Sequence, residues 1–370
     1  MIRIGLIGTG GIALANHLPG VHRCGDARVT ALCDNNPQVL AEAARVSGIE
    51  RVHADPLALI AGGDLDAVII ATPNRSHHPV AMSAIRAGLH VLCEKPLAMT
   101  VEEAREMAAA ADGAGVRHMT AFTYRFVPAM RYCKHLVTQG YVGEPWHFRA
   151  QRFQDWGRRA LGWRQRLADA GSGELGDMLS HRIDYGHLLV GPIARVTAQT
   201  RLLVPSRVDA AGQEHAADAE DWVACLASFE SGATGVFEST KVATGRGEGA
   251  RSHDYCEVNG PEGTLVYELA HPQRLLAARR GGSGLDEVRV PDEWLTYSGA
   301  ALEAGIDPQQ AFRWDQNLEF VSAIREGRPC TPSFHDGVRV QEVMEAILQS
   351  AREGIAVTVD RADRGPAIPA

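Results

Sequence analysis

The stretch Arg3-Ile-Gly-Leu-Ile7-Gly8-Thr-Gly10-Gly-Ile-Ala13 opens the chain and decides its fold. A short apolar strand runs into a glycine-rich turn of the form G-x-G-x-x-A, and the turn opens a helix. Gly8 permits the tight turn, Gly10 lets a pyrophosphate approach the backbone, and Ala13 lets helix and strand pack closely. Free N–H groups at the start of the helix favour bound phosphate. The stretch therefore predicts a unit that binds a dinucleotide.

Strands and helices alternate through the first 122 residues. The apolar runs typical of strands are Val29–Cys33, Ala67–Ala71 and Leu89–Cys93, and the helical stretches are His77–Ala87 and Val101–Ala114. Strands that alternate with helices form a parallel, doubly wound sheet that is buried on both faces. We therefore predict an α/β fold whose dinucleotide-binding Rossmann domain spans residues 1–122.

The sequence changes in character after residue 122. Longer, more alternating runs follow, at Trp146–Phe153, Ile193–Leu203, Asp221–Phe229, Ala233–Thr240, Tyr255–Asn259 and Thr264–Tyr267, with helices at Pro128–Gln139 and Gly176–Leu189. Alternation of apolar and polar residues is typical of strands with one buried face. Residues 123–370 are therefore expected to form a second α/β domain, with an open, mainly antiparallel sheet that serves substrate binding and oligomerisation.

The composition excludes several classes of partner. The 370 residues carry a formal net charge of −8, which argues against nucleic acid and against an anionic membrane surface as partners. No stretch approaches the ~20 continuous apolar residues that are needed to cross a bilayer. The seven cysteines are scattered and never spaced Cys-x-x-Cys. This pattern favours unpaired thiols in a reducing cytoplasm and predicts no metal site.

Polar residues at the strand ends predict how a cofactor binds. Asp34 closes the second strand, where it can accept hydrogen bonds from an adenosine ribose; the alternative is that it only starts the next helix. Asn35 and Asn36 follow, without an arginine or lysine for a 2′-phosphate, so NAD is preferred over NADP. Ligands of a doubly wound sheet bind at the carboxyl ends of its strands. The expected cofactor-binding residues at this edge are Gly8, Thr9, Gly10, Gly11, Ile12, Asp34, Thr72, Asn74, His77, Glu94 and Lys95.

Lys95 is the only lysine of the first domain, and it follows the strand Leu89–Cys93. Because it lies at the edge where the cofactor is expected, its ammonium group would face the nicotinamide. An ordinary surface lysine is the alternative interpretation.

Several motifs in combination resemble one family. Glu94-Lys95-Pro96 follows a strand, Ala71-Thr-Pro-Asn-Arg-Ser-His-His78 precedes it, and Gly260-Pro-Glu-Gly-Thr-Leu265 and Phe320-Val-Ser-Ala-Ile-Arg-Glu-Gly-Arg-Pro329 come later. Together they resemble the Gfo/Idh/MocA family, which is named for glucose–fructose oxidoreductase and inositol dehydrogenase. The resemblance implies an NAD-dependent oxidoreductase with a Rossmann domain. It also implies a second domain whose open sheet often supports homo-oligomers, here a dimer or tetramer, and a catalytic role for Lys95.

The resemblance extends to a glycine-rich turn followed by Asp-x-x-x-His. Here the turn is Gly171-Ser-Gly-Glu-Leu-Gly-Asp177-Met-Leu-Ser-His181. The pair Trp163-Arg164 precedes it and is expected near the nicotinamide end of the cofactor. Thr123-Tyr124-Arg125 departs from the pattern, because many family members carry an asparagine before this arginine. The substrate contacts of this loop are therefore left open.

Three side chains of the predicted helix form a candidate catalytic group. Asp177, His181 and Asp184 stand at positions i, i+4 and i+7, which share one face of an α-helix. A carboxylate one turn away can fix the tautomer of the imidazole. When a hydride leaves a carbinol carbon, the hydroxyl proton must also depart, so a general base is required. We predict that His181 is this base, with Asp177 as its partner and Lys95 as a base or proton relay; a structural helix histidine is the alternative. His22 and His187 lack such partners and are assigned structural roles.

A local basic cluster precedes the catalytic turn. Arg149–Arg166 contains six arginines against one aspartate, with two tryptophans between them. Guanidinium groups bind carboxylate, sulfonate or phosphate in a bidentate manner, and indole rings suit the C–H faces of sugars. This suggests a sugar with an anionic group; an oligomer interface or a solvated face is the alternative. The expected substrate-binding residues are Lys95, Tyr124, Arg125, Arg152, Trp156, Asp177, His181 and Asp184.

Three functions remain open from the sequence. The first is an NAD-dependent dehydrogenase that abstracts hydride from a secondary alcohol, at C3, of a sugar or sugar glycoside, for instance a uronic or sulfonated hexose. The second is a redox-neutral glycosidase, in which NAD is reduced and reoxidised around an elimination and a hydration. The third is a sugar or NAD sensor without catalysis, which the set of Lys95, Asp177 and His181 disfavours.

Overall fold

The chain forms two compact units. The structure is a computed structural model that describes residues 1–209, 211–248, 252–297 and 308–361. The first unit comprises Met1–Thr123 and Arg313–Gln341, and the second comprises Tyr124–Phe312 and Glu342–Ala370. None of the helices in the described ranges is long and apolar enough to span a membrane.

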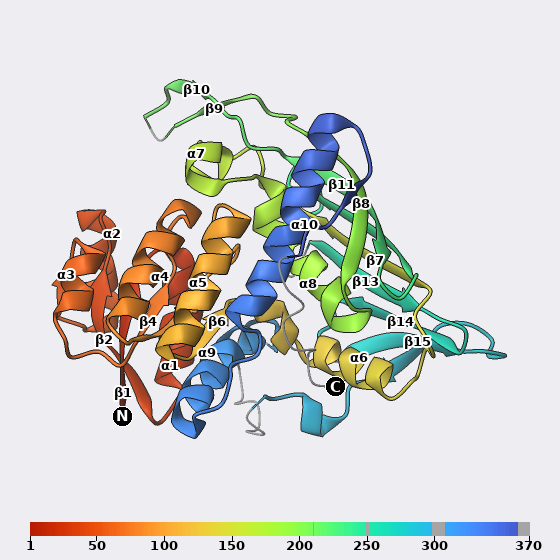
Figure 1. Cartoon of the computed structure of the whole chain (residues 1–370), viewed down its shortest axis with the longest axis horizontal. Coiled ribbons are helices and arrows are strands. Elements are labelled where there is room, and N and C mark those ends of the chain that lie inside the picture. Colours follow the sequence, from red (N-terminus) through yellow and green to blue (C-terminus); the bar gives the residue numbers. More distant parts are fainter. Residues whose placement is uncertain (210, 249–251, 298–307, 362–370) are drawn as a thin grey trace. The chain divides into compact units, whose positions relative to one another are not determined.

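A parallel sheet forms the centre of the first unit (Figure 1). Its strands in the described chain are β1 (Ile2–Ile7), β2 (Ala27–Cys33), β3 (Val52–His53), β4 (Ala67–Ile70), β5 (His90–Cys93) and β6 (His118–Thr120). They lie in the order β3-β2-β1-β4-β5-β6, and every pairing is parallel. The predicted doubly wound Rossmann sheet is therefore confirmed.

Helices connect these strands. They are η1 (Ala13–His17), α1 (Leu18–His22), α2 (Pro37–Ser47), α3 (Pro56–Ala61), η2 (Asn74–Ser76), α4 (His77–Arg86) and α5 (Val101–Ala114). Asn36 begins α2, since its side-chain oxygen accepts hydrogen bonds from the N–H groups of Gln38 (3.0 Å) and Val39 (3.2 Å). Gly48 ends the same helix in the left-handed conformation, φ +71°.

The end of the chain returns to the first unit. Two helices, α9 (Pro308–Glu326) and α10 (Phe334–Glu353), bring the segment Arg313–Gln341 into it. Phe334 is fully buried in the same apolar cluster as Leu97 and Val116. A single boundary after residue 122 does not capture this return, because the segment is separated from its packing partners by some 200 residues of the second unit.

A large mixed sheet dominates the second unit. Its strands in the described chain are β7 (His147–Phe153), β8 (Ile193–Arg201), β11 (Trp222–Phe229), β12 (Thr234–Thr240), β13 (His253–Asn259), β14 (Gly263–Glu268), β15 (Arg274–Arg279), β16 (Asp286–Arg289) and β17 (Val357–Thr358). Their order is β16-β15-β14-β13-β7-β12-β11-β8-β17, and β9 (Ser206–Val208) pairs separately with β10 (Glu214–Ala216). Only β7 and β12 run parallel among these pairs of the described chain. The predicted mainly antiparallel sheet is confirmed.

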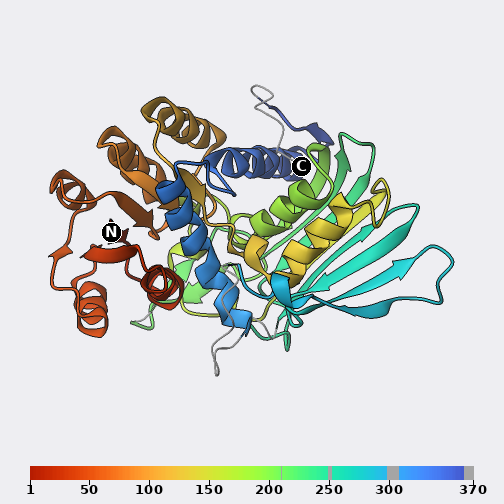
Figure 2. The same cartoon turned by 90° about the horizontal axis from the view of Figure 1, so that it is seen from below.

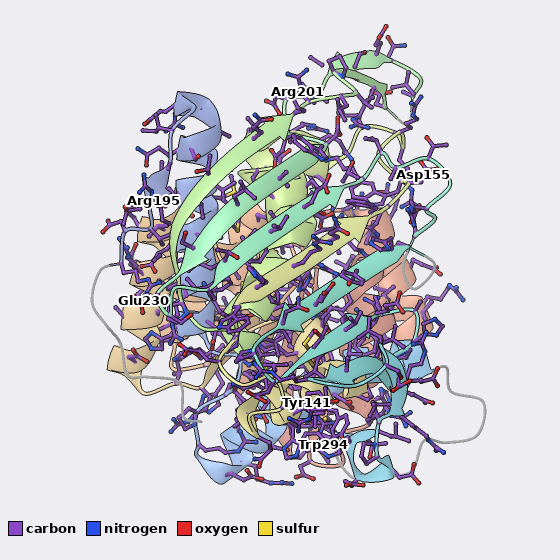
Figure 3. All side chains as sticks on the ribbon, turned by 90° about the vertical axis from the view of Figure 1, so that its right-hand side faces the viewer. Tyr141, Asp155, Arg195, Arg201, Glu230 and Trp294 are labelled. Atoms are coloured by element: carbon purple, nitrogen blue, oxygen red, sulfur yellow. The ribbon has the colours of Figure 1, made fainter. Side chains whose placement is uncertain are left out.

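One face of this sheet is covered by helices and the other is open. Helices α6 (Pro128–Thr138) and α8 (Ser180–Leu189) lie side by side along the covered face (Figure 2). Short helical turns complete the unit: η3 (Thr123–Phe126), η4 (Trp163–Gln165), α7 (Leu167–Ala170), η5 (Leu175–Leu179) and η7 (Asp292–Trp294). Along β11, Val223 and Cys225 are buried while Leu226 is 62% exposed, as period-two alternation requires. Figure 3 faces the open side.

Candidate active site

The glycine-rich turn after β1 leaves its backbone accessible. Gly8 has φ +86°, and a Cβ there would lie 2.5 Å from the carbonyl oxygen of Ala71, so this position requires glycine. Gly10 and Gly11 are exposed, and a Cβ on either would meet nothing within 4 Å. The neighbouring Ile12 is 36% exposed. A phosphate group can therefore reach the N–H groups at the start of the helical segment.

Asp34 joins the end of β2 to this turn. Its Oδ2 accepts hydrogen bonds from the backbone N–H of Thr9 (2.8 Å) and from Thr9 Oγ1 (3.2 Å), and its Oδ1 accepts one from the N–H of Asn36 (2.9 Å). Because Asn36 provides the cap of α2, Asp34 is not that helix's side-chain cap. Each oxygen of a carboxylate can accept more than one hydrogen bond, so Asp34 can still bind a ribose hydroxyl.

The His77 side chain connects the end of β4 with the turn Glu94-Lys95-Pro96. This buried imidazole places Nδ1 2.9 Å from the carbonyl oxygen of Pro96 and Nε2 3.0 Å from that of Thr72. Burial lowers the pKa of His77 despite these two acceptors. Thr72 Oγ1 is buried and finds no hydrogen-bond partner among the residues that the structure describes. Asn74 is buried at the start of η2.

Glu94 and Lys95 follow β5 directly. Glu94 Oε1 lies 2.9 Å from His17 Nε2, and the Glu94 side chain is 12% exposed. Burial would raise the pKa of Glu94, but the hydrogen bond from His17 and the positive charges of His17 and Lys95 outweigh it and lower that pKa. Lys95 is half-buried. The sequence analysis did not select His17, which lies at the end of the π-helix η1.

These features fit NAD at the carboxyl edge of the first sheet. The open turn at Gly10 and Gly11 would hold the pyrophosphate, and Asp34 the adenosine ribose. The unpartnered Thr72 hydroxyl offers a further hydrogen bond at the same edge. Lys95, at the end of β5, completes the group that the sequence predicted there.

In the second unit, the glycine-rich turn Gly171–Asp177 is fixed by a close backbone approach. A Cβ on Gly173 would lie only 2.0 Å from the carbonyl oxygen of Glu220, so the turn requires glycine here. The N–H of Glu174 donates to that oxygen (3.0 Å), and the N–H of Leu175 donates to Glu220 Oε1 (3.0 Å). Glu220 therefore determines where the following residues lie.

The helix after this turn differs from the regular α-helix that we expected. Its first part, η5, is a π-helix, and α8 begins at Ser180. A π turn is wider than an α turn, so Asp177 and His181 are not related by one α-helical turn. His181 is 3% exposed, and its ring packs edge-on against Tyr124 with ring centroids 4.6 Å apart. The helix was correctly predicted, but its first turn was not.

Two groups of predicted site residues come together in the second unit. Arg164 Nε donates to Asp177 Oδ1 (3.2 Å), and the Arg164 guanidinium lies 4.3 Å from the centre of the Trp163 ring. Separately, Arg125 Nε donates to Asp184 Oδ2 (2.8 Å) in a buried ion pair, next in sequence to Tyr124. The structure thus places Trp163 and Arg164, which were expected at the cofactor, beside Asp177, which was predicted to be catalytic.

The basic cluster does not form one patch. Arg149 is exposed on β7, whereas Arg152 faces the opposite side of that strand, is 1% exposed and pairs with Asp254 (3.0 Å). Arg159 pairs with Glu248 on the surface. Trp156 is half-buried, with the Lys241 ammonium 5.5 Å from its ring centre. The charges are therefore divided among several carboxylate partners.

A buried acid within the catalytic turn escaped the sequence analysis. Glu174 is fully buried; its Oε1 accepts a hydrogen bond from Ser239 Oγ (2.5 Å), and its Oε2 has no hydrogen-bond partner among the described residues. Burial, with the negative charge of Asp177, raises the pKa of Glu174 to about 8. Glu174 is thus mainly neutral at pH 7. The available signal was a charged residue inside the otherwise small and apolar run Gly173–Gly176.

Three potential metal ligands gather elsewhere in the first unit. Asp112 lies 3.2 Å from His118 Nε2 and 2.9 Å from His335 Nε2. The N–H of Phe334 donates to His118 Nδ1 (3.0 Å), so the neutral His118 ring carries its proton on Nε2, towards Asp112. A metal-bound histidine instead donates its other N–H to an acceptor. These hydrogen bonds favour a histidine–carboxylate contact over a metal site.

The sequence matches two models of one family. Residues 2–122 match the GFO/IDH/MocA oxidoreductase family, described as an NAD-binding Rossmann fold, and residues 130–266 match the GFO/IDH/MocA C-terminal domain. Levoglucosan dehydrogenase of Pseudarthrobacter phenanthrenivorans is 33% identical over 86% of this chain and 86% of its own. D-apiose dehydrogenase of Paraburkholderia graminis is 30% identical over 95% of this chain and 88% of its own.

A solved structure is similar over nearly the whole chain. It is a levoglucosan dehydrogenase in complex with NADH and levoglucosan, with a TM-score of 0.89 at 32% identity, covering 97% of this chain and 100% of that one. Three findings agree in assigning NAD as the cofactor: the matches to the family models, the Rossmann sheet and the open glycine-rich turn. The chain belongs to the GFO/IDH/MocA oxidoreductase family, with an NAD-binding Rossmann domain followed by the family's C-terminal domain.

Proposed function

We propose that the protein is an NAD-dependent dehydrogenase that abstracts hydride from a secondary alcohol, at C3, of a sugar or sugar glycoside. The observation that carries the proposal is the position of Lys95, half-buried at the edge where the Gly8–Ile12 turn also ends. Two relatives that are named dehydrogenases of levoglucosan and D-apiose support a sugar as the substrate.

The reaction converts a carbinol to a ketone and releases one proton. NAD, when bound, accepts the hydride. In the proposal, His181 of the second unit takes the hydroxyl proton, and Lys95 of the first unit donates a hydrogen bond to the same hydroxyl oxygen. The ring of Tyr124 restricts the imidazole of His181, and Arg164 orients Asp177. An imidazole suits this role because it ordinarily titrates near neutral pH.

The decisive experiment removes each candidate base. Lys95→Ala and His181→Ala should each abolish turnover while NAD still binds, which calorimetry can measure. Near-normal rates in either variant would remove that residue from the mechanism. A sugar carrying deuterium at C3 should pass the label to NADH, and label retained in the ketone would place the oxidation at another carbon.

An anionic sugar remains a candidate substrate. Its support is the arginine-rich segment before the catalytic turn, although Arg152 and Arg159 each already pair with a carboxylate. An anionic substrate would have to compete with such partners, whereas a neutral sugar would not. Rates on glucosides compared with their uronic and sulfonated counterparts decide the matter, since equal rates would contradict selection by charge.

The redox-neutral glycosidase is the second candidate. A ketone at C3 acidifies the C2 proton, so elimination of the aglycone, hydration and return of the hydride can follow the same first step. This reaction needs a further proton donor. The Tyr124 ring packs on His181, so its hydroxyl is a candidate for that donor. Release of aglycone without accumulation of NADH would favour this reaction, and stoichiometric NADH would favour the dehydrogenase.

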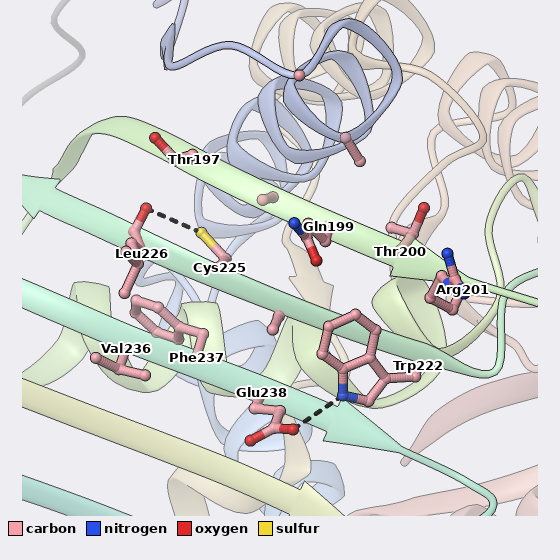
Figure 4. A pocket seen from close by; sticks show the side chains of 14 residues that line it. Thr197, Gln199, Thr200, Arg201, Trp222, Cys225, Leu226, Val236, Phe237 and Glu238 are labelled. Carbon is pink, nitrogen blue, oxygen red and sulfur yellow. Dashed lines mark hydrogen bonds between the residues drawn. The ribbon is translucent and has the colours of Figure 1, made fainter.

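We further propose that the open sheet face docks a second copy of the chain in a dimer or tetramer. On this face Leu226 is 62% and Val236 37% exposed, and Trp222 donates its indole N–H to Glu238 (2.9 Å) beside a shallow pocket (Figure 4). Leu226→Glu should lower the molar mass measured by light scattering, and an unchanged mass would exclude this face.

The proposal retains a cytoplasmic location, supported by seven buried cysteines that are free of disulfides.

A further inference from the structure

His17 is a buried imidazole with an acceptor at each ring nitrogen. It ends η1, directly after the glycine-rich turn, and is 0% exposed. Its Nε2 lies 2.9 Å from Glu94 Oε1, and its Nδ1 lies 3.1 Å from Asn317 Oδ1 on α9. All three residues belong to the first unit, although Asn317 is 300 positions away from His17 along the chain.

The amide of Asn317 has one favourable orientation. Its Nδ2 lies 3.4 Å from the carbonyl oxygen of Asn16 and 3.5 Å from that of Trp314, and both oxygens can only accept. A flipped amide would set oxygen against these two oxygens. A Cβ on Gly20 would lie 2.3 Å from Nδ2, so the glycine makes room for this arrangement. Asn317 Oδ1 therefore faces His17, and His17 Nδ1 must carry a proton to bond to it.

The second nitrogen faces a carboxylate. Glu94 Oε1 faces His17 Nε2, and Glu94 Oε2 accepts a hydrogen bond from the backbone N–H of Lys95, so both oxygens are placed as those of an ionised carboxylate. An ionised carboxylate only accepts hydrogen bonds, so His17 Nε2 must also carry a proton. A ring with protons on both nitrogens is an imidazolium. Besides His17 and Lys95, His77 also acts on the charge of Glu94.

We propose that His17 is an imidazolium that is paired with Glu94, and that this ion pair is the positioning element for Lys95. Glu94 Oε2 accepts a hydrogen bond from the backbone N–H of Lys95 (3.3 Å), so the pair constrains the turn on which the lysine stands. The same histidine ends the segment that follows the cofactor turn. The link to turnover rests on the proposed function, whereas the protonation state of His17 does not.

Neutron diffraction of the wild-type enzyme, grown and crystallised in D₂O near neutral pH, tests the charge directly. The expected result is deuterium on both ring nitrogens of His17 and none on the carboxyl oxygens of Glu94. In the Glu94→Gln variant, where the anion is lost, His17 should carry a single ring deuterium. A bare His17 nitrogen in the wild type, or deuterium on Glu94, would overturn the proposal.

Kinetics test the positioning role. His17→Gln leaves Glu94 without its counter-charge and should lower kcat roughly a hundredfold through displacement of Lys95, with a smaller change in KM for NAD. The double variant His17→Gln/Glu94→Gln contains no buried charge and keeps a hydrogen bond between the two side chains. Its kcat should be at least about tenfold higher than that of His17→Gln.

The two readouts separate the possible failures. If the fall in kcat of the double variant equals the product of the falls in the two single variants, charge compensation is not the role of His17. If His17→Gln does not fold, the double variant still provides the comparison, because it should fold and turn over within about tenfold of wild type. If Lys95→Ala retains turnover, the proposed role of Lys95 fails, and with it the positioning role of the ion pair, while the neutron result for His17 stands or falls independently.

Discussion

Each of the two units buries a carboxyl group beside a candidate catalytic residue, and the two carboxyl groups differ in charge. Burial opposes ionisation in both. In the first unit, the hydrogen bond from His17 and the charges of His17 and Lys95 nevertheless lower the pKa of Glu94. In the second, burial and the negative charge of Asp177 raise the pKa of Glu174 to about 8, and Ser239 provides only a neutral donor. The partner therefore decides the charge of a buried carboxyl group, not the depth of burial alone.

The largest expected effect comes from moving the second turn. In Gly173→Ala the new Cβ would lie 2.0 Å from the Glu220 carbonyl oxygen, so the backbone that carries Glu174 and Asp177 must shift. We expect kcat to fall roughly a hundredfold and the melting temperature to drop, because small displacements in an active site are costly. Steady-state rates and thermal unfolding measure both effects. Gly113→Ala, where a Cβ meets nothing within 4 Å, is the control; it should leave kcat unchanged and should not lower the melting temperature, because alanine favours helix α5.

The next effect tests the charge of Glu174 through the pH dependence of stability. Its folded-state pKa of about 8 lies above the ordinary value of 4.5, so its contribution to stability is complete below pH 4.5 and is lost as the pH rises towards 8. Glu174→Gln should not show this loss. Between pH 5 and pH 8 the wild type should lose a few kcal/mol relative to the variant, with an upper bound of about 5 kcal/mol. Urea unfolding across this range measures the difference.

Glu94→Gln should show the opposite sign. Because the folded-state pKa of Glu94 is lowered, its stabilising contribution is present above the ordinary value and is lost as the pH falls through the folded-state pKa. The wild type should therefore lose stability relative to this variant as the pH falls below the ordinary value of 4.5. If the stability of both variants, each relative to wild type, changed with pH in the same direction, the distinction between the two carboxyl groups would be lost.

A smaller effect is expected at the open turn of the first unit. Gly10→Ala adds a methyl group that meets no protein atom within 4 Å, so the melting temperature of the apoenzyme should stay the same. The methyl group would occupy the space through which a pyrophosphate approaches the backbone, and we expect the Kd for NAD to rise about tenfold, or about 1.4 kcal/mol. Titration calorimetry measures this. An unchanged Kd would place the pyrophosphate elsewhere.

The smallest effect is expected for a surface ion pair that contacts neither Glu94 nor Glu174. Arg159 pairs with Glu248, and their side chains are 63% and 38% exposed. Exposed ion pairs are screened by water, so Arg159→Gln should change the free energy of unfolding by less than about 0.5 kcal/mol. Urea unfolding at low and high salt provides the check. A loss comparable to that of a buried pair would mean that this surface is covered in the assembled enzyme.

The fold could be predicted where the signal is local. The glycine turn at Gly8, the apolar strands and the strand-helix alternation each occupy consecutive residues, and together they predict the first sheet. The return of Arg313–Gln341 could not be found in this way, because its partners lie far away in sequence. The π turn Leu175–Leu179 was missed because its residues also suit an α-helix.

The candidate site was predictable in its residue types and less so in its contacts. Lys95 and the cofactor turn follow from strand ends that share one edge. Arg152 was expected at the substrate, yet it is three positions from the exposed Arg149 on a strand and therefore faces the opposite side. His17 and Glu174 were missed because their roles depend on partners, Asn317 and Ser239, that no local pattern reveals.

The return of helix α9 to the first unit has a consequence for biosynthesis. Asn317 and Phe334 belong to the first unit, and the ribosome adds them only after Tyr124–Phe312 of the second unit. The first unit therefore cannot be completed until Tyr124–Phe312 of the second unit has been synthesised, so the two units are interleaved during synthesis. Nascent chains that end before Arg313 would lack Phe334, so part of the apolar cluster around Leu97 and Val116 would stay exposed to water.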